Sequence, residues 1–136
     1  MERKATYRLK VTRREMLYVG DVPDHTLMLT EMEGEPIEYL IGLAGDFLFR
    51  RSVTFHDRIK GTGPIQGYAI TAFQHGSVYS RFEGHRDGHT KLSNGTWKTY
   101  KGAGTLSGIQ GEGTFKVKPG EEAQEFVIEI LGEYRI

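Results

Sequence analysis

Apolar and aromatic residues alternate with polar ones along most of the chain, and turn-forming pairs such as DG at 87–88 and NG at 94–95 separate the runs. An alternation with a period of two is typical of strands that bury one face of a sheet. The predicted strands are residues 5–19, 25–32, 37–42, 46–58, 65–74, 77–85, 95–101, 103–117 and 123–135. Since no run has the period of a helix, we expect an all-β protein of antiparallel strands, in which some adjacent runs are continuous.

The stretch GAGTLSGIQGEGTF, at residues 102–115, is rich in glycine and has two interpretations. A dinucleotide-binding loop would be followed by a helix whose amino terminus holds the pyrophosphate. Here Phe115 and Val117 continue a strand pattern instead, with Gly111 and Gly113 on the same face. The strand interpretation is therefore favoured, and the missing side chains leave room for bulky residues from across the core or for a ligand.

The same stretch also indicates how the sheet closes. Leu106 lies three residues before Ile109, so a regular strand would point the two side chains to opposite faces. Both can face inward if a bulge near Gly108 absorbs one residue. Bulges and glycine kinks coil a sheet until it closes on itself. We therefore predict that residues 1–136 form a single domain, a closed antiparallel barrel of about eight strands with a corner here.

Composition narrows the choice of partner and compartment. The chain has 136 residues, no cysteine, and 18 basic against 18 acidic residues. This balance gives no electrostatic footprint for nucleic acid or for an anionic membrane. The first residues, MERKATYR, are charged rather than apolar, which excludes a signal peptide at that position. The sequence therefore predicts a cytoplasmic protein that binds neither nucleic acid nor a membrane.

The segments HGSVYSRFEGH, GTW and YKGAGTLSGIQGEGTF follow one another between residues 64 and 117. This succession resembles bacterial members of the allene oxide cyclase-like barrel superfamily, which also contains the plant dirigent proteins. The resemblance implies an eight-stranded antiparallel barrel with a cavity, often assembled as a dimer or trimer. Plant cyclases of this kind isomerise a fatty-acid epoxide, and dirigent proteins guide the coupling of phenolic radicals. Their catalytic carboxylate, tyrosine and arginine have no one-to-one match here, so neither activity is predicted.

One arginine stands among aromatic residues in DFLFRRSVTFHDR. Strand periodicity places it on a single face with its apolar neighbours, which gives the set Phe47, Phe49, Arg51, Val53 and Phe55. If this face lines the lumen, the Arg51 guanidinium would bind an anionic ligand group through paired hydrogen bonds. The pattern also allows an internal ion pair of Arg51, or an aromatic face turned outward against another subunit.

Three further aromatic residues are candidates for the wall of a ligand cavity. Tyr68 and Trp97 each combine an apolar body with one polar group, which suits contact with a small molecule. Phe82 shares a face with Val78 and Ser80 of its own strand. The alternative is that all three are ordinary core residues with satisfied donors. The predicted ligand-binding residues are Arg51, Phe49, Phe55, Tyr68, Phe82 and Trp97.

The five histidines do not have the spacing of a metal site. His85, Asp87 and His89 flank a DG turn, where side chains normally project into water. His56 and Asp57 are adjacent, so a strand sends them to opposite faces. No serine stands in a nucleophile turn such as GxSxG. The sequence therefore predicts no metal site, no cofactor and no identifiable catalytic residue.

These observations together predict a barrel with an apolar lumen that binds a small amphipathic organic acid. A second hypothesis is an isomerase, lyase or cyclase that works without a cofactor in the same cavity, with Arg51 or Tyr68 polarising the substrate. A third is a non-catalytic subunit whose core is filled. The generous aromatic content further predicts a homodimer or homotrimer that buries one apolar strand face.

Overall fold

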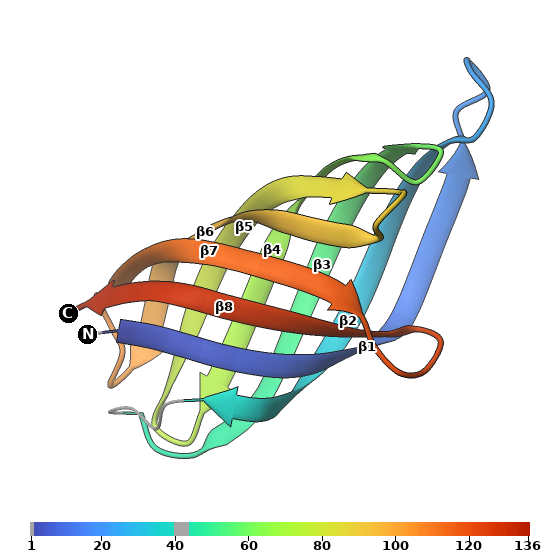
Figure 1. The fold of residues 1–136 in the computed structure, drawn as a ribbon. Coiled ribbons are helices and arrows are strands. Elements are labelled where there is room, and N and C mark those ends of the chain that lie inside the picture. The colour runs from blue at the N-terminus through green and yellow to red at the C-terminus, as the bar shows by residue number, and fades with distance from the viewer. Residues whose placement is uncertain (1, 40–43) are drawn as a thin grey trace.

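The computed structural model describes residues 2–39 and 44–136 and arranges them as eight antiparallel strands in one closed barrel (Figure 1). The strands are β1 (Glu2–Tyr18), β2 (His25–Tyr39), β3 (Phe47–Ile59), β4 (Gly63–Phe73), β5 (Gly76–Asp87), β6 (Leu92–Gly104), β7 (Gln110–Pro119) and β8 (Glu125–Arg135). Each strand pairs with the next one in sequence, and β8 pairs with β1 to close the barrel. The predicted all-β fold and closed eight-stranded antiparallel barrel are confirmed.

The predicted strands 25–32 and 37–42 belong to one strand, β2, as far as the described residues extend. Gly34 stays within the sheet, because it pairs with β1 on one side and with Arg50 of β3 on the other. Residues 40–42 of the second predicted strand lie outside the described residues. The chain therefore needs one strand fewer than the sequence pattern indicated.

Residues 105–109 of the glycine-rich stretch form the hairpin connection between β6 and β7, so the predicted bulge inside a single strand is wrong. The N–H of Leu106 donates to the carbonyl oxygen of Ala103 at 3.2 Å, and the N–H of Ile109 donates to that of Leu106 at 3.1 Å. Gly108 adopts a φ of +81°, a conformation that glycine reaches without strain. The turn, rather than a bulge, thus brings Leu106 and Ile109 to the same interior, where each is 5% exposed.

Gly111 and Gly113 face the interior as predicted, and aromatic side chains fill the space that they leave. A Cβ at position 111 would collide with the ring of Tyr134, and one at position 113 would collide with the β8 backbone and with Nε1 of Trp97. The rings of Trp97 and Tyr134 in turn pack together, with centroids 5.5 Å apart. The space that these glycines leave is therefore occupied by bulky residues from across the core, which is one of the two uses that the sequence allowed.

Replacing Gly111 with valine is expected to destabilise the protein by about 1–3 kcal/mol, because the Tyr134 ring must leave its position or β7 must shift. Chemical denaturation of variant and wild type measures this difference. Thr114→Val, on the outer face of the same strand, is the control and is expected to change the free energy of unfolding by less than about 0.5 kcal/mol. An unchanged stability of the Gly111 variant would contradict the packing described.

The two ends of the barrel differ. The terminal end, on the left of Figure 1, carries both chain termini and the connections β2–β3, β4–β5 and β6–β7, and the hairpin end carries the remaining connections. Leu106 and Ile109 fill the interior at the terminal end as part of the buried core. The other buried members of this core are Ala5, Tyr7, Leu9, Met32, Ala44, Ile65, Val78, Trp97, Phe115, Ile128, Ile130 and Tyr134.

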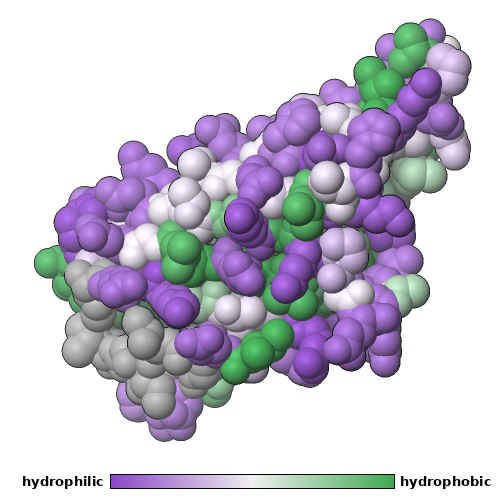
Figure 2. All heavy atoms as spheres, in the orientation of Figure 1, coloured by the Kyte–Doolittle hydropathy of each residue, from purple (hydrophilic) through white to green (hydrophobic). Residues whose placement is uncertain are grey.

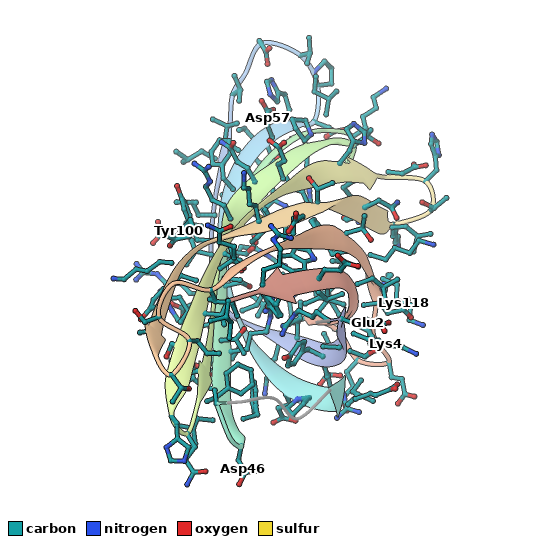
Figure 3. The ribbon with its side chains drawn as sticks, turned by 90° about the vertical axis from the view of Figure 1, so that its left-hand side faces the viewer. Glu2, Lys4, Asp46, Asp57, Tyr100 and Lys118 are labelled. Carbon is teal, nitrogen blue, oxygen red and sulfur yellow. The ribbon has the colours of Figure 1, made fainter. Side chains whose placement is uncertain are left out.

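At the hairpin end, the β1–β2 hairpin projects beyond the rest of the barrel (Figure 1, upper right), and residues 12–18 of β1 pair with β2 alone while β2 stays paired with β3. The exposed apolar residues of this hairpin include Leu17 and Tyr18, and green spheres mark the apolar surface near its tip in Figure 2. The His25 side chain links the tip of this hairpin to β3, since Nδ1 lies 2.6 Å from Asp21 and Nε2 lies 2.7 Å from Asp57, which is labelled in Figure 3. These hydrogen bonds to Asp21 and Asp57 raise the pKa of His25 and favour the imidazolium form.

Candidate functional site

The predicted site around Arg51 depends on which face of β3 lies inside the barrel. The pairing of β3 with β4 has a register shift between Phe47 and Phe49. This shift reverses the alternation, so Phe47 packs against the core whereas Phe49 is 49% exposed. From Phe49 onward the aromatic face of β3 lies outside and its polar face lies inside. The inward residues are Arg50, Ser52, Thr54, His56 and Arg58.

The prediction that Arg51 lines the lumen is therefore wrong. Its guanidinium lies on the outer surface and donates to Oε2 of Glu31 from Nη2 at 2.6 Å and from Nε at 2.9 Å. Phe55 lies on the same outer face, and Tyr68 is 52% exposed on the neighbouring strand. Phe49, Phe55 and Tyr68 are thus also absent from the lining of the lumen, as the alternative of an outward aromatic face implied.

Phe82 and Trp97 are the two predicted site residues that do line the interior cavity. They pair with each other across β5 and β6. The indole Nε1 of Trp97 donates to the carbonyl oxygen of Leu131 at 3.2 Å, and the Phe82 ring meets Phe115 edge to face with centroids 5.6 Å apart. Each of the two therefore serves as a core residue and as part of the cavity wall.

A cavity of about 80 Å³ runs along the inside of the barrel. One water needs about 10–15 Å³ on a comparable scale, so the cavity is narrow and suits a slender molecule. It extends from Arg3 and Arg50 at the terminal end to Arg58, Arg86 and Lys91 at the hairpin end. Its apolar lining residues are Leu9, Met32, Ile65, Ala69, Phe82, Trp97, Phe115, Val117, Phe126, Ile128 and Ile130.

The charged side chains that line the described part of the cavity are all basic. They are Arg3, Arg50, Arg58, Arg86 and Lys91, and no aspartate or glutamate lines the described part of the cavity. A cation in a poorly hydrated interior is unfavourable unless a counter-charge lies close to it. The lumen is therefore partly electropositive, and the prediction of an apolar lumen describes only part of its lining.

Arg50 is the most buried of these cations, with 8% of its surface exposed. Its Nη1 donates to Oγ1 of Thr71 at 3.0 Å, and its guanidinium lies over the Tyr7 ring, 5.1 Å from the ring centroid. Its Nε is buried and has no hydrogen-bond partner among the described residues. Burial lowers the pKa of Arg50 to about 10, which leaves the side chain charged at neutral pH. Arg50 thus offers an unused charged donor.

Farther along β3, Nη2 of Arg58 lies 3.1 Å from Nδ1 of His56. A guanidinium can only donate, so Nδ1 is the unprotonated acceptor and the imidazole carries its proton on Nε2. That proton is donated to Oγ1 of Thr30 at 3.0 Å. Burial, followed by the charges of Arg58, Arg14 and Arg86, lowers the pKa of His56 to about 3. His56 is therefore neutral. In addition, Nε of Arg58 is a second buried donor that has no partner in the described residues.

The remaining cations lie where the cavity approaches the hairpin end. Nη1 of Arg86 donates to the carbonyl oxygen of Gly61 at 2.6 Å, which fixes the side chain against the β3–β4 turn. Lys91 is exposed in the turn between β5 and β6. Burial lowers the pKa of Arg86. This end of the cavity therefore carries most of its positive charge, since Arg58, Arg86 and Lys91 are three of the five basic lining residues.

Sequence reasoning missed Arg50, His56 and Arg58. A signal for them was present, because every second residue from Arg50 to Arg58 is polar. The aromatic residues on the opposite face made that face the better candidate for the interior. Only the position of the register shift near Phe49 shows which of the two faces is turned inward.

Across residues 2–39 and 44–136, no group of three or more His, Asp or Glu side chains could hold a metal ion. In the same residues, no helix is long and apolar enough to cross a membrane. Comparison of the sequence with protein-family models gives no match, and comparison with curated proteins gives none either. The resemblance to allene oxide cyclase-like barrels therefore stays a prediction, and a function has to be argued from the lumen itself.

Proposed function

We propose that this barrel binds a small amphipathic organic anion in its lumen. The observation that carries the proposal is the Arg50 guanidinium, which is buried, charged and holds Nε without a partner among the described residues. An anionic group of a ligand would supply the missing acceptor and counter-charge. The proposal keeps the ligand class that the sequence predicted, and it replaces Arg51 with its neighbour Arg50.

The way in which arginines are paired elsewhere in the chain supports this proposal. On the outer surface, Arg51 and Arg135 each contact a carboxylate, with N–O distances of 2.6 Å and 2.8 Å. Inside the barrel, Arg50, Arg58 and Arg86 are held instead by neutral acceptors, which are a hydroxyl, an imidazole and a backbone carbonyl. These neutral acceptors hold the interior cations in place, but no acidic side chain among the described lining residues balances their charge.

The apolar part of the lumen would contact the body of the ligand. Phe115 of β7 and Ile128 and Ile130 of β8 lie on the wall of the cavity, as does the face of Trp97. Small-molecule sites are typically apolar walls with a few convergent polar groups that set the orientation. A ligand with a slender apolar body and an anionic end matches both parts of this lining.

The same geometry favours binding over catalysis. An isomerase, lyase or cyclase requires an acid or base with a free approach to the substrate. His56 lines the cavity, but Thr30 and Arg58 engage both of its ring nitrogens. No aspartate or glutamate is among the described lining residues. We therefore propose a binding protein without a chemical step.

The predicted homodimer or homotrimer and the predicted cytoplasmic location remain predictions. The outward aromatic residues Phe49, Phe55 and Tyr68 form the kind of apolar strand face that such an assembly would bury. Sedimentation at about tens of micromolar tests the assembly, a concentration chosen to suit common interface affinities.

The substitution Arg50→Met tests the proposed function. In titration calorimetry with aliphatic and aromatic monocarboxylates, Arg50→Met is expected to weaken binding by about 1.5–3 kcal/mol, the value of a hydrogen bond to a charged group. Methionine keeps most of the apolar stem of arginine. The matched control is Arg51→Met, which removes the neighbouring guanidinium from the outer face and is expected to leave affinity within about 0.5 kcal/mol.

Two results would count against the proposal. If wild type and Arg50→Met bind the acids with equal affinity, the lumen does not use this guanidinium. If no acid of the panel binds the wild-type protein, the proposed ligand class is wrong. Thermal unfolding of each variant shows whether a loss of binding reflects a loss of the fold.

A further inference from the structure

We infer that the lumen holds two anion sites, one toward each end, and that its ligand is an elongated molecule with an anionic group at both ends. This inference rests on the proposed function and specifies its ligand. The first site is the unused Nε donor of Arg50 near the terminal end. The second is formed by Arg58, Arg86 and Lys91 near the hairpin end, where the cavity lining continues.

The second site stands on its own observations. Nε of Arg58 is buried without a partner in the described chain, just as Nε of Arg50 is. The Arg58 guanidinium donates from Nη2 to Nδ1 of the neutral His56, at 3.1 Å. Burial and the nearby Arg86 and Arg14 lower the pKa of Arg58 to about 10, which shows that like charges oppose one another here. An anion among these cations would relieve that repulsion.

The two sites are too far apart for one carboxylate. Arg50 and Arg58 are eight residues apart on β3, and Arg58 reaches back as far as His56. About six residues at about 3.3 Å each then separate the two groups, which is about 20 Å. An extended chain advances by about 1.2 Å per bond, so a molecule of about 16 carbons would span the distance.

The wall between the sites suits such a chain. On the β7–β8 side it consists of Phe115, Ile128 and Ile130, and Trp97 adds its ring. The small cavity volume, about 80 Å³, matches one unbranched chain better than a fused ring system. At the terminal end Leu106 and Ile109 fill the interior, so one anionic group would enter first and reach Arg50 while the other stays at the hairpin end.

The test compares a linear dicarboxylate of about 16 carbons with the monocarboxylate of the same length, by titration calorimetry on the complete chain. The dicarboxylate is expected to bind wild type about tenfold tighter or more, the effect of one added charge-assisted hydrogen bond. Arg58→Met is expected to abolish this advantage, so that the two acids bind the variant with equal affinity. Arg81→Met, on the exposed outer face of β5, is the control and should keep the full advantage.

Each alternative outcome has a definite meaning. Equal affinity of the two acids for wild type, or an advantage that survives in Arg58→Met, would overturn the second site and leave the proposed function standing. Failure of both acids to bind would overturn the proposed function and this inference with it. If Arg58→Met does not fold, the double substitution Arg86→Met and Lys91→Met takes its place, and an undiminished dicarboxylate advantage in that variant would again overturn the inference.

Discussion

The free energy of unfolding is expected to fall by about 2–3 kcal/mol through His56 alone when the pH is lowered from about 7 to about 4.5. Burial and the neighbouring arginines lower the pKa of folded His56 to about 3, whereas an unfolded histidine has a pKa of about 6.5. Between these two values the unfolded state binds a proton that the folded state does not. The contribution of His56 is therefore complete above about pH 6.5 and is lost as the pH falls.

The substitution His56→Gln isolates this effect. Glutamine does not titrate, and its amide can still accept from Arg58 and donate to Thr30. Denaturation curves of both proteins at the two pH values give the difference, in which the contributions of the carboxylates cancel. His25 acts in the opposite sense, since its raised pKa gives a contribution that is present below about pH 6.5. A variant that loses stability as steeply as wild type would contradict the assignment to His56.

Replacing Trp97 with alanine is expected to destabilise the barrel by about 3–5 kcal/mol, the range for truncating a large buried aromatic residue. The Trp97 ring packs against Gly113 and Gly132. Only 7% of the residue is exposed. Its Nε1 also donates to the carbonyl oxygen of Leu131. Strands joined by backbone hydrogen bonds cannot collapse into the space that alanine leaves, so most of the cavity would persist.

The matched control for this change is Tyr100→Ala on the same strand. Tyr100 is 52% exposed and lies on the outside of the barrel, where Figure 3 labels it. Its ring meets Tyr68 edge to face with centroids 5.8 Å apart, a contact worth about 0.5–1.5 kcal/mol. Urea denaturation of both variants compares the two losses directly. Losses of equal size would show that Trp97 does not fill the interior as described.

The architecture was predictable because strand alternation is a local property of the sequence. A period of two along β3 to β8, with turn residues between the runs, left antiparallel strands as the simplest arrangement. The sequence also predicted correctly which side chains of β7 point inward, namely Phe115 and Val117, together with the two glycines between Ile109 and Phe115 on the same face. The boundary near Gly108 was not, because a bulge and a tight turn both use a glycine and bury the same two neighbours.

The site residues were less predictable than the strands that carry them. Phe82 and Trp97 were found because large aromatic residues on a strand are usually inward. Arg51 was assigned to the lumen on the same reasoning, and the structure places it in an exposed ion pair with Glu31. One unpaired residue near Phe49 produces this difference, since a shift of one position exchanges the two faces of a strand.

The sequence by itself determined that the chain forms antiparallel strands, that a glycine-lined face leaves room for bulky core residues or for a ligand, and that β3 has one aromatic and one polar face. Only the tertiary structure decided which of these faces is inside. Both are compatible with a strand, and the choice depends on the register of β3 against β2 and β4 and on closure of the sheet between β1 and β8. Burying Arg50, His56 and Arg58 is unfavourable for β3 alone, so local preference points to the opposite face. Closure turns the polar face inward, and the cavity acquires the cations Arg50 and Arg58 from that choice.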